Sequence, residues 1–537
     1  PENVIRLQVL VDKEVGALRS DRLASQSEWC EECPRACMAD VLRVHEYRYV
    51  REVQEKCEAV QEGKVANLDG DTAVSPFSFE AAMHAAGGVC HAIDQVCGGM
   101  KKNAFCATRP PGHHAGYRGV VEGGEEKHGS AGFCLINNVA VGAAYAKCMY
   151  RHKGIKKVAI IDFDVHHGNG TEDIVRNLIP SIETHPINTP LFNGSISTDK
   201  YRPWLEDDDV NNVFFVSTHG FGRKSAPDAM NREPWFYPGT GASCGCMPPM
   251  PPQNGEPSST TIQTGSTFPP IFGGSFDASK FKFPDQGESM VVNVGIDAYA
   301  MDEVTGQTSF NQASRLVWRD AYRRAIFPRL MEFNPDLILI SAGFDAHKKD
   351  SMASGFIGLI EDDYHWVTRH LTAIANSCCE GRIVSCLEGG YNIKGGFIST
   401  FARSVASHVD ALVHPSKEGW KQNDAIWESE HENKLFREQQ KRRLMKIEKE
   451  KQLERDRMKE RMEALEQKNN EPQDPSSNSA DSSSSSSSSS TTTTTTEQVA
   501  EEPPSKRSRR ASKVVDYAAL ALQLDEEKKN KQNPPSE

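Results

Sequence analysis

The residues best suited to chemistry stand in one stretch, 158–170, which reads Val-Ala-Ile-Ile-Asp-Phe-Asp-Val-His-His-Gly-Asn-Gly. The first four residues are apolar, as expected of a strand buried on both faces of a parallel sheet. Asp164 and His166 are two positions apart, so in an extended chain both side chains leave the same face and can share one metal ion. The alternative is a strand end whose acids only cap the next helix. We favour the metal site because the acids and the histidines occur together.

Asp345, which follows another apolar run, can complete that metal site with Asp164 and His166. One imidazole and two carboxylates leave positions open for water and substrate, as catalytic zinc requires, and the lack of a cysteine argues against a closed structural site. A metal lowers the pKa of water toward about 7, so the site would hold an activated water at neutral pH. The neighbouring His167 is left without a chemical task, and we interpret it as structural.

Other polar residues could assist such a metal. The adjacent His113 and His114 follow a rigid Pro-Pro-Gly turn and could carry the water's proton to the leaving group. Asp162 and Asn169 flank the metal ligands and are available to orient these histidines. Tyr391, in a Gly-Gly-Tyr turn, could donate a hydrogen bond to an attacked carbonyl. The set predicts hydrolysis of an amide or an ester.

Strands and helices that must position these residues alternate along the chain. Apolar runs typical of buried strands cover residues 158–161, 213–218, 290–294, 337–341 and 383–387. Helical patterns cover residues 78–96, 137–152, 314–333 and 362–378. This alternation predicts an α/β fold with a mostly parallel central sheet. The reactive residues collect at the carboxyl ends of the strands, where ligands bind in such sheets.

Composition narrows the classes of function. The chain has 537 residues, a net charge of −12 and 38% hydrophobic residues. The acidic balance does not favour DNA binding, so we expect no direct sequence-specific contact with DNA, and it could instead attract a basic peptide. No run of about 18 apolar residues occurs, so we expect no membrane span. The first residue is Pro1 rather than Met, so we expect the chain to begin inside a longer reading frame.

Cysteines are scattered along the chain rather than spaced as a disulfide framework. Cys30, Cys33 and Cys37 are close together, but no second cysteine pair with zinc-finger spacing completes the set. We favour ordinary buried, reduced thiols in an intracellular protein, with a structural zinc site as the alternative.

Several segments fall outside the α/β pattern. Residues 179–212 and 222–288 are rich in Pro, Gly, Ser, Asn and Thr and are interpreted as surface insertions. Residues 427–468 are typical of a solvated charged helix rather than a firm coiled coil. A disordered low-complexity tail is expected over 469–537. Within it, Lys506–Arg510 is a basic cluster compatible with nuclear import or with a plain solvated charge run.

Six blocks of the sequence resemble, in the same order, those of the histone deacetylases of the arginase-like fold, most closely class II. They are Arg109-Pro-Pro-Gly-His-His-Ala115, Gly132-Phe-Cys-Leu-Ile-Asn-Asn138, Asp162-Phe-Asp-Val-His-His-Gly-Asn-Gly-Thr171, Tyr237-Pro-Gly-Thr-Gly241, Ser341-Ala-Gly-Phe-Asp-Ala-His347 and Leu387-Glu-Gly-Gly-Tyr-Asn392. The resemblance implies a three-layer catalytic domain over residues 1–415, with helices on both faces of the sheet. The family's first strand would be missing, because the start at Pro1-Glu2 resembles a segment that follows that strand.

The resemblance also implies a role for each reactive residue. His114 would be the main general base and acid, with Asn169 behind it, and His113 would pair with Asp162. Tyr391 would polarise the acetyl carbonyl. The zinc ligands would be Asp164, His166 and Asp345.

Substrate and potassium contacts are implied in the same way. Phe133 and Tyr237 would form the walls of a narrow channel around the acetyl-lysine stem, and the Gly132 carbonyl would accept the substrate amide proton. A potassium ion would be held, partly through backbone oxygens, by Asp162, Asp164, His166, Ser217 and Thr218.

We therefore expect a zinc-dependent hydrolase that removes acetyl groups from lysine side chains of histones and represses transcription, in the nucleus with the option of shuttling to the cytoplasm. The alternatives are a deacetylase of a non-histone protein such as tubulin or of acetylpolyamines, and a recruitment scaffold with secondary catalysis. Expected partners are acetylated histone tails or other acetyl-lysine proteins, and corepressor-type proteins bound through the C-terminal tail. An arginase-like hydrolase with two manganese ions is disfavoured, because it would need more carboxylates in the strand-end motifs.

Overall fold

The structure is a computed structural model that describes residues 2–121, 131–180, 182–199, 202–222, 236–242, 289–297, 312–353 and 355–469. The chain divides into two units, Pro1–Arg457 and Met458–Glu537, and every predicted site residue falls in the first. Most of the predicted insertion 222–288, the tail after residue 469 and the basic cluster Lys506–Arg510 lie outside the described residues.

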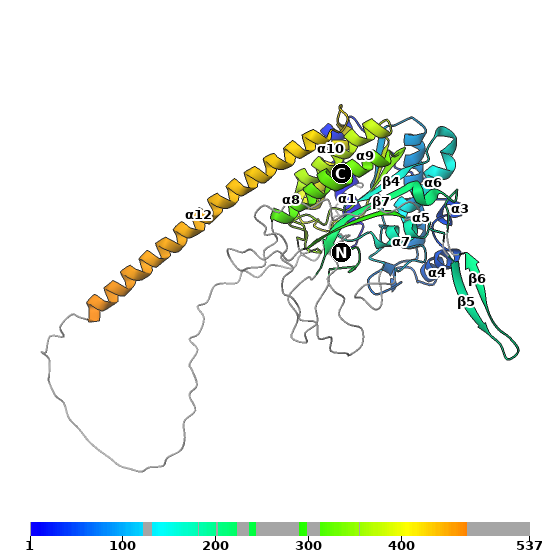
Figure 1. Ribbon diagram of the computed structural model, residues 1–537, viewed down its shortest axis with the longest axis horizontal. Coiled ribbons are helices and arrows are strands. Elements are labelled where there is room, and N and C mark those ends of the chain that lie inside the picture. Colours follow the sequence, from blue (N-terminus) through cyan, green and yellow to red (C-terminus); the bar gives the residue numbers. More distant parts are fainter. Residues whose placement is uncertain are drawn as a thin grey trace, which may run out of the picture. The chain divides into compact units, whose positions relative to one another are not determined.

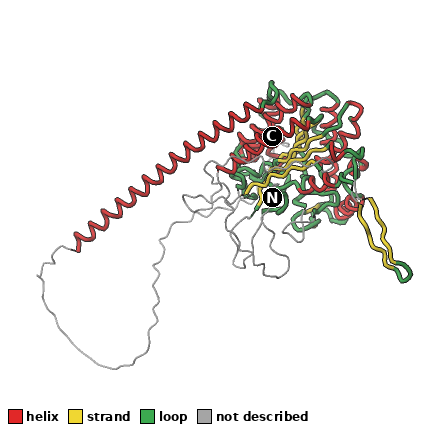
Figure 2. Tube along the Cα trace, viewed as in Figure 1, coloured by secondary structure: helices red, strands yellow, loops and turns green. Residues whose placement is uncertain are grey.

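A six-stranded sheet forms the centre of the first unit (Figure 2). Its neighbouring strands pair in parallel. In spatial order the strands are β3 (Asn103–Cys106), β10 (Ile383–Leu387), β9 (Leu337–Ala342), β4 (Val158–Asp162), β7 (Val213–Phe221) and β8 (Met290–Asp297). Every residue of β4, β9 and β10 is buried, as expected where both faces of a parallel sheet are covered. The prediction of a mostly parallel α/β sheet is confirmed.

Helices cover both faces of this sheet (Figure 1). One face carries α5 (Ser78–Cys97) and α6 (Asn138–Met149). The other carries α8 (Gln312–Ala321), the π-helical turn η5 (Tyr322–Ile326), α9 (Phe327–Phe333), α10 (Glu361–Cys378) and α11 (Thr400–Val413). Successive strand residues point to opposite layers, so Ile160 packs in the core beside α5 and α6 while Ile161 packs in the core beside α10 and α11. The three-layer arrangement is therefore as predicted.

Short elements fill the rest of the first unit. They are α1 (Ile5–Val11), η1 (Ala17–Arg19), α2 (Asp21–Ala24), α3 (Met38–Val41), α4 (Tyr47–Glu58), β1 (Ala66–Asn67), β2 (Ala73–Val74), η2 (Arg151–Lys153), α7 (Asn169–Arg176), η3 (Asp209–Asn211) and η6 (Gly396–Ile398). Helix α7 begins at Asn169, directly after the cluster of aspartates and histidines that follows β4. The turn between β4 and α7 therefore carries the reactive stretch.

The predicted insertion at 179–212 is only partly a surface feature. An antiparallel hairpin is formed by β5 (Ile182–Asn188) and β6 (Asn193–Asp199). After it, Trp204 and Val210 are buried, and Asp209 Oδ2 accepts a hydrogen bond from the Trp204 N–H across 2.8 Å. This part belongs to the packed domain, unlike the predicted insertion. Its isolated apolar residues follow no helix or strand period that could have indicated burial.

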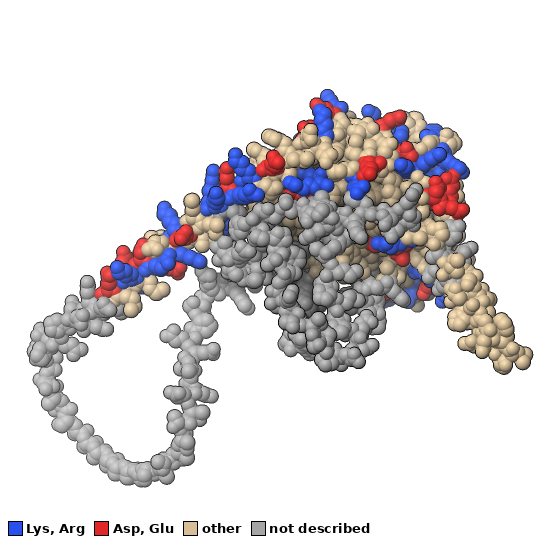
Figure 3. Space-filling view, in the orientation of Figure 1, with Lys and Arg blue, Asp and Glu red and all other residues tan. Residues whose placement is uncertain are grey.

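Helix α12 (Gln422–Asn469) begins before the predicted charged helix 427–468, and its first turns are packed against the domain. Ala425 is buried, and the Glu428 carboxylate accepts a hydrogen bond from Arg323 Nε across 3.2 Å. Farther along α12, Lys and Arg side chains are interspersed with Asp and Glu side chains (Figure 3). No described helix is both long and apolar enough to cross a membrane.

Candidate active site

The reactive residues meet at the carboxyl ends of neighbouring parallel strands. Asp162 ends β4 and is level with Ser217 on β7 and with Ser341 on β9. Asp345 lies in the turn after β9, and Glu388 directly follows β10. These motifs lie far apart in the sequence, and the strand order β10-β9-β4-β7 brings them to one edge of the sheet.

Asp164, His166 and Asp345 form a group that could hold one metal ion. One ligand atom from each lies within 4.8 Å of the others, and it is the only such group among the described residues. His166 Nδ1 lies 3.2 Å from Asp164 Oδ1 and 3.1 Å from Asp345 Oδ2. The opposite carboxylate oxygens accept hydrogen bonds from the backbone, Asp164 Oδ2 from Gly389 N at 2.8 Å and Asp345 Oδ1 from Val165 N at 3.1 Å. The backbone therefore turns the remaining oxygens toward the imidazole.

The chemistry of this group fits zinc. Burial, together with the neighbouring Asp164 carboxylate, raises the pKa of Asp345 to about 6, so a bound cation would relieve an unfavourable concentration of negative charge. Two oxygens and one nitrogen are donors that catalytic zinc accepts with a position left open. A Cβ atom at Gly389 would lie 2.2 Å from Asp345 Oδ2 and 2.5 Å from Asp164 Oδ2, so only glycine leaves room for the carboxylates there.

His114 is held as a neutral imidazole. Its Nδ1 lies 2.8 Å from Asn169 Oδ1, an amide oxygen that can only accept, so Nδ1 carries the proton. Burial and the charges of His113 and His166 lower the pKa of His114 well below its ordinary value. The Nε2 atom of this ring therefore keeps a lone pair at neutral pH.

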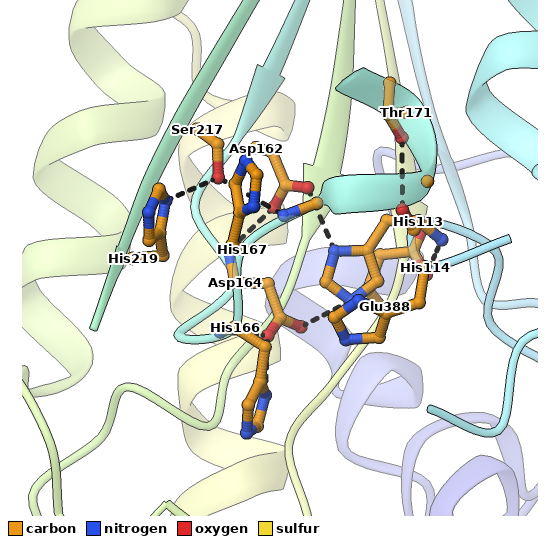
Figure 4. Close-up of polar contacts among 12 residues, drawn as sticks. His113, His114, Asp162, Asp164, His166, His167, Thr171, Ser217, His219 and Glu388 are labelled. Atoms are coloured by element: carbon orange, nitrogen blue, oxygen red, sulfur yellow. Dashed lines mark hydrogen bonds and ion pairs between the residues drawn. The ribbon is translucent and has the colours of Figure 1, made fainter. Parts of the chain in front are cut away.

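His113 is held in the opposite state. Its Nδ1 lies 3.0 Å from Asp162 Oδ2, and its Nε2 lies 3.8 Å from Asp164 Oδ2 (Figure 4). Burial alone would lower the pKa of His113, but these two carboxylates raise it to about 10. The adjacent rings, with centroids 4.0 Å apart, are thus one charged and one neutral. Both predicted pairings, His114 with Asn169 and His113 with Asp162, are present, while their catalytic roles stay predictions.

Aromatic rings stand beside these histidines. Tyr237 meets the His114 ring edge-on with centroids 5.1 Å apart, and Phe133 meets Tyr391 edge-on at 5.9 Å. Gly132 has φ +51°, and a Cβ there would lie 2.4 Å from His114 Cδ2 and 3.1 Å from the Tyr237 hydroxyl. Of the predicted substrate-contacting residues, Gly132 and Tyr237 therefore lie against His114, and Phe133 lies against Tyr391.

The predicted potassium ligands also lie together. Ser217 is level with Asp162, and Thr218 Oγ1 lies 3.4 Å from the Asp162 carbonyl oxygen. The Ser217 hydroxyl hydrogen-bonds with His219 Nδ1 at 2.9 Å, as Figure 4 shows. The potassium site stays a prediction.

A buried polar cluster behind Tyr391 was not predicted from the sequence. Glu388 Oε2 accepts a hydrogen bond from Gly112 N at 2.8 Å, and its backbone oxygen accepts from Arg6 Nη2 at 2.8 Å and from Arg109. Burial raises the pKa of Glu388 to about 7. The cluster joins the turn that carries His113 and His114 to the turn that carries Tyr391. Arg109 and Glu388 lie in two of the six sequence blocks that resemble the histone deacetylases, and this position was the only indication of their role in the sequence.

The cysteine cluster is incomplete as a metal site among the described residues. Cys30 Sγ and Cys33 Sγ lie 3.8 Å apart, and neither belongs to a described group of three metal-ligating side chains. Cys30 and Cys37 are exposed and form no disulfide, so the prediction of buried thiols is wrong for these two residues.

Known proteins resemble this chain over the domain that holds the site. The family model described as "Histone deacetylase domain" matches residues 1–412. "Type-2 histone deacetylase 2" of Dictyostelium discoideum is 33% identical over 348 residues, which are 65% of this chain and 15% of that protein. A "Probable deacetylase" of Archaeoglobus fulgidus is 28% identical over 409 residues, which are 76% of this chain and 80% of that protein. The solved "HDA15 HD domain" aligns with 80% of this chain and 88% of its own, with a TM-score of 0.48 and 22% identity.

The chain thus spans about a seventh of the length of the Dictyostelium relative. The family match covers the six-stranded sheet together with every residue assigned above to the metal group, the paired histidines and the aromatic rings. This chain belongs to the histone deacetylase family.

Proposed function

We propose that this chain is a zinc-dependent hydrolase that removes acetyl groups from lysine side chains of proteins, with histone tails among its substrates. The observation that carries the proposal is the pair of adjacent histidines beside the Asp164–His166–Asp345 group, with His114 held by the Asn169 amide and His113 by the Asp162 carboxylate. Family membership and the name of the Dictyostelium relative support it.

The metal would occupy the group formed by Asp164, His166 and Asp345. Bound there, zinc would supply Lewis-acid polarisation of an acyl carbonyl and would make water more acidic. The contribution of the chain is to hold the ligands in place through the backbone hydrogen bonds from Gly389 and Val165.

His114 would move the proton. Its Nδ1–H is committed to Asn169, so the lone pair of Nε2 can take a proton from the attacking water and return it to the lysine nitrogen as the amide bond breaks. His113, kept positive by Asp162, would stabilise the negative charge that develops during attack.

Tyr391 would donate a hydrogen bond to the oxygen of the attacked carbonyl. Burial raises the pKa of Tyr391 well above its ordinary value, so the phenol keeps its proton at neutral pH. Its backbone N–H donates to Asp350 Oδ2 at 2.7 Å, and the Arg6 guanidinium lies 4.6 Å from the ring centroid. These contacts hold the Tyr391 ring in place. A fixed ring matters because a hydrogen-bond donor stabilises developing charge best when it is already oriented.

The substrate class follows from the aromatic rings. Tyr237 lies against His114, and Phe133 lies against Tyr391. A channel between these two aromatic rings would suit the unbranched alkyl stem of lysine. Acetylpolyamines have similar alkyl stems, and acetylated tubulin carries the same acetyl-lysine side chain. Both are therefore competing substrates.

The test is acetate release from an acetyl-lysine histone peptide, measured beside acetylated tubulin and an acetylpolyamine at equal concentrations. We expect the histone peptide to give the highest kcat/KM and chelation to abolish release. Faster turnover of tubulin or of the polyamine would reassign the substrate, and no release from any of the three would refute the function.

Nuclear location and repression of transcription remain part of this proposal. The basic composition of Lys506–Arg510, which lies outside the described residues, supports the nuclear location. Repression of transcription would follow from the proposed histone substrate. Alanine substitution of this cluster should move the protein from the nucleus to the cytoplasm in imaging of intact cells, and an unchanged distribution would remove the cluster from the proposal. Corepressor-type partners of the tail should co-purify with the full chain and be lost on deletion of residues 469–537, and a full chain that co-purifies with none would remove them from the proposal.

A further inference from the structure

Residues 236–242, hereafter the wall segment, carry Tyr237 and are held against the turn that provides the metal ligands. The Phe236 ring is buried and lies parallel to the His166 ring, with centroids 5.1 Å apart and an interplanar angle of 7°. It also stacks on Phe356 at 3.9 Å, and its backbone N–H donates to the Gly222 oxygen at 2.9 Å. One end of the wall segment is thus anchored on a metal-ligating side chain.

The other end is anchored by His167, the residue left without a task by the sequence. His167 Nδ1 lies 2.8 Å from Thr240 Oγ1. Its Nε2 faces two oxygens, Glu172 Oε2 at 2.7 Å and Asn293 Oδ1 at 3.1 Å, so Nε2 carries a proton. Because Glu172 and Asn293 fix the ring from behind, Nδ1 is presented to the Thr240 hydroxyl in one orientation.

A second histidine completes this anchor. His219 Nε2 lies 2.7 Å from the Gly241 carbonyl oxygen, which can only accept, so Nε2 donates and Nδ1 accepts from the Ser217 hydroxyl. The His167 and His219 rings have centroids 4.4 Å apart. Gly241 has φ +80°, and a Cβ there would lie 2.4 Å from His219 Nε2 and 2.7 Å from His167 Cδ2. The segment lies directly on the two rings, with no room for a side chain.

We propose that His167 and His219 are positioning residues that fix the wall segment and thereby set the affinity of the site for the acyl-lysine stem. Tyr237 lies three residues before Thr240 and meets His114 edge-on, so displacement of Thr240 and Gly241 would change the distance between Tyr237 and the paired histidines. The role in affinity rests on the proposed function, whereas the anchoring itself does not.

Two substitutions at Thr240 separate this role from general stability. Thr240→Val keeps the shape and removes only the hydroxyl, which leaves a buried imidazole nitrogen without its partner, whereas Thr240→Ser keeps the hydroxyl. For the acetyl-lysine peptide we expect Thr240→Val to raise KM roughly tenfold with kcat changed less than about twofold, and Thr240→Ser to restore the wild-type KM. Equal KM values for the two variants, or a fall in kcat alone, would overturn the proposal.

A second measurement needs no activity. Amide hydrogen exchange across residues 236–242, recorded after chelation, should be faster in Thr240→Val and Gly241→Ala than in wild type. The matched control is Gly63→Ala, since Gly63 has φ +75° but nothing within 4 Å of an added methyl group, so it bears the backbone strain without the collision. Unchanged exchange in both test variants would show that the histidines do not fix the segment. If the wild-type protein released no acetate, the proposed function would fail while this measurement still decided the anchoring.

Discussion

The Nδ1–H group of His114 donates a hydrogen bond to Asn169 Oδ1 across 2.8 Å, so the orienting partner of this histidine is a neutral amide. An amide fixes the tautomer but adds no negative charge that would favour the imidazolium. The neighbouring His113, in contrast, is paired with the Asp162 carboxylate. The two adjacent histidines therefore differ in charge because their partners differ in charge.

Replacing this amide by a carboxylate should shift the pH dependence of the reaction. His114 must be neutral to accept a proton, so activity falls as the pH drops through its pKa. Burial and the two neighbouring histidines hold that pKa well below its ordinary value of 6.5, so the acidic limb of kcat/KM lies below pH 6.5. Asn169→Asp should raise the pKa and move the limb to higher pH. The pH–rate profile measures this, and Asn169→Ala controls for loss of the hydrogen bond.

Removing the phenol of Tyr391 should slow the chemical step. Tyr391→Phe keeps the ring on Arg6 and Phe133 but deletes the donor, and loss of one such donor costs about 10²–10³ in kcat. KM should change little, since the hydrogen bond strengthens mainly in the transition state. Tyr150→Phe is the control, because its hydroxyl donates to Asp94 far from the site. Steady-state kinetics in which both variants lose kcat equally would contradict the assignment.

The proposed metal group can be tested by comparing two aspartates that flank the same strand, β9. Asp345→Asn keeps the size of the side chain and removes the charge, so we expect metal content after dialysis to fall and acetate release to be lost. Asp336→Asn serves as the control, since Asp336 stands before the same strand, β9, and accepts hydrogen bonds from Lys156 N and Lys157 N at the opposite end. Elemental analysis showing full metal occupancy in Asp345→Asn would exclude Asp345 as a ligand.

The sheet could be predicted because its strands are continuous apolar runs that differ sharply from the segments around them. Val158–Ile161 has four apolar residues followed at once by acids, and every residue of β4 is buried. The β5–β6 hairpin could not be predicted, because its exposed residues show no polar and apolar alternation. The sequence predicts a charged helix from residue 427, whereas α12 begins at Gln422. Its first turns pack through charged residues such as Glu428, which resemble a solvated helix in sequence.

Some contacts of the candidate site could be predicted from the sequence, and others could not. Asp164, His166 and Asp345 adjoin strand ends, so parallel pairing alone brings them together. Arg6 donates to the Glu388 backbone oxygen, a contact between residues 382 positions apart. His219 donates to the Gly241 carbonyl oxygen, and in the sequence it is a single histidine that belongs to no motif. Such contacts depend on how the turns are packed, and neither spacing nor residue type records that packing.

Glu428 tests whether α12 is part of the packed domain. Its carboxylate accepts hydrogen bonds from Trp366 Nε1 at 2.9 Å and Arg323 Nε at 3.2 Å, and it lies 3.4 Å from His370 Nε2. Burial opposes ionisation, but the hydrogen bond from His370 and the charge of Arg323 lower the pKa of Glu428 to about 2. A group whose pKa falls on folding stabilises the folded state above its unfolded pKa, and this contribution is lost as the pH drops through the folded value.

Glu428→Gln should therefore lower the free energy of unfolding by about 1–2 kcal/mol at pH 7, a value reduced for the partial exposure of the group. The difference from wild type should be full above pH 4.5 and shrink steadily toward pH 2, because the wild-type carboxylate is then protonated as well. Urea unfolding at pH 7, 4 and 3 measures it. Glu418→Gln, which removes an exposed ion pair with Lys421, should have almost no effect. A difference that stayed constant down to pH 3 would show that packing, and not the charge of Glu428, joins α12 to the domain.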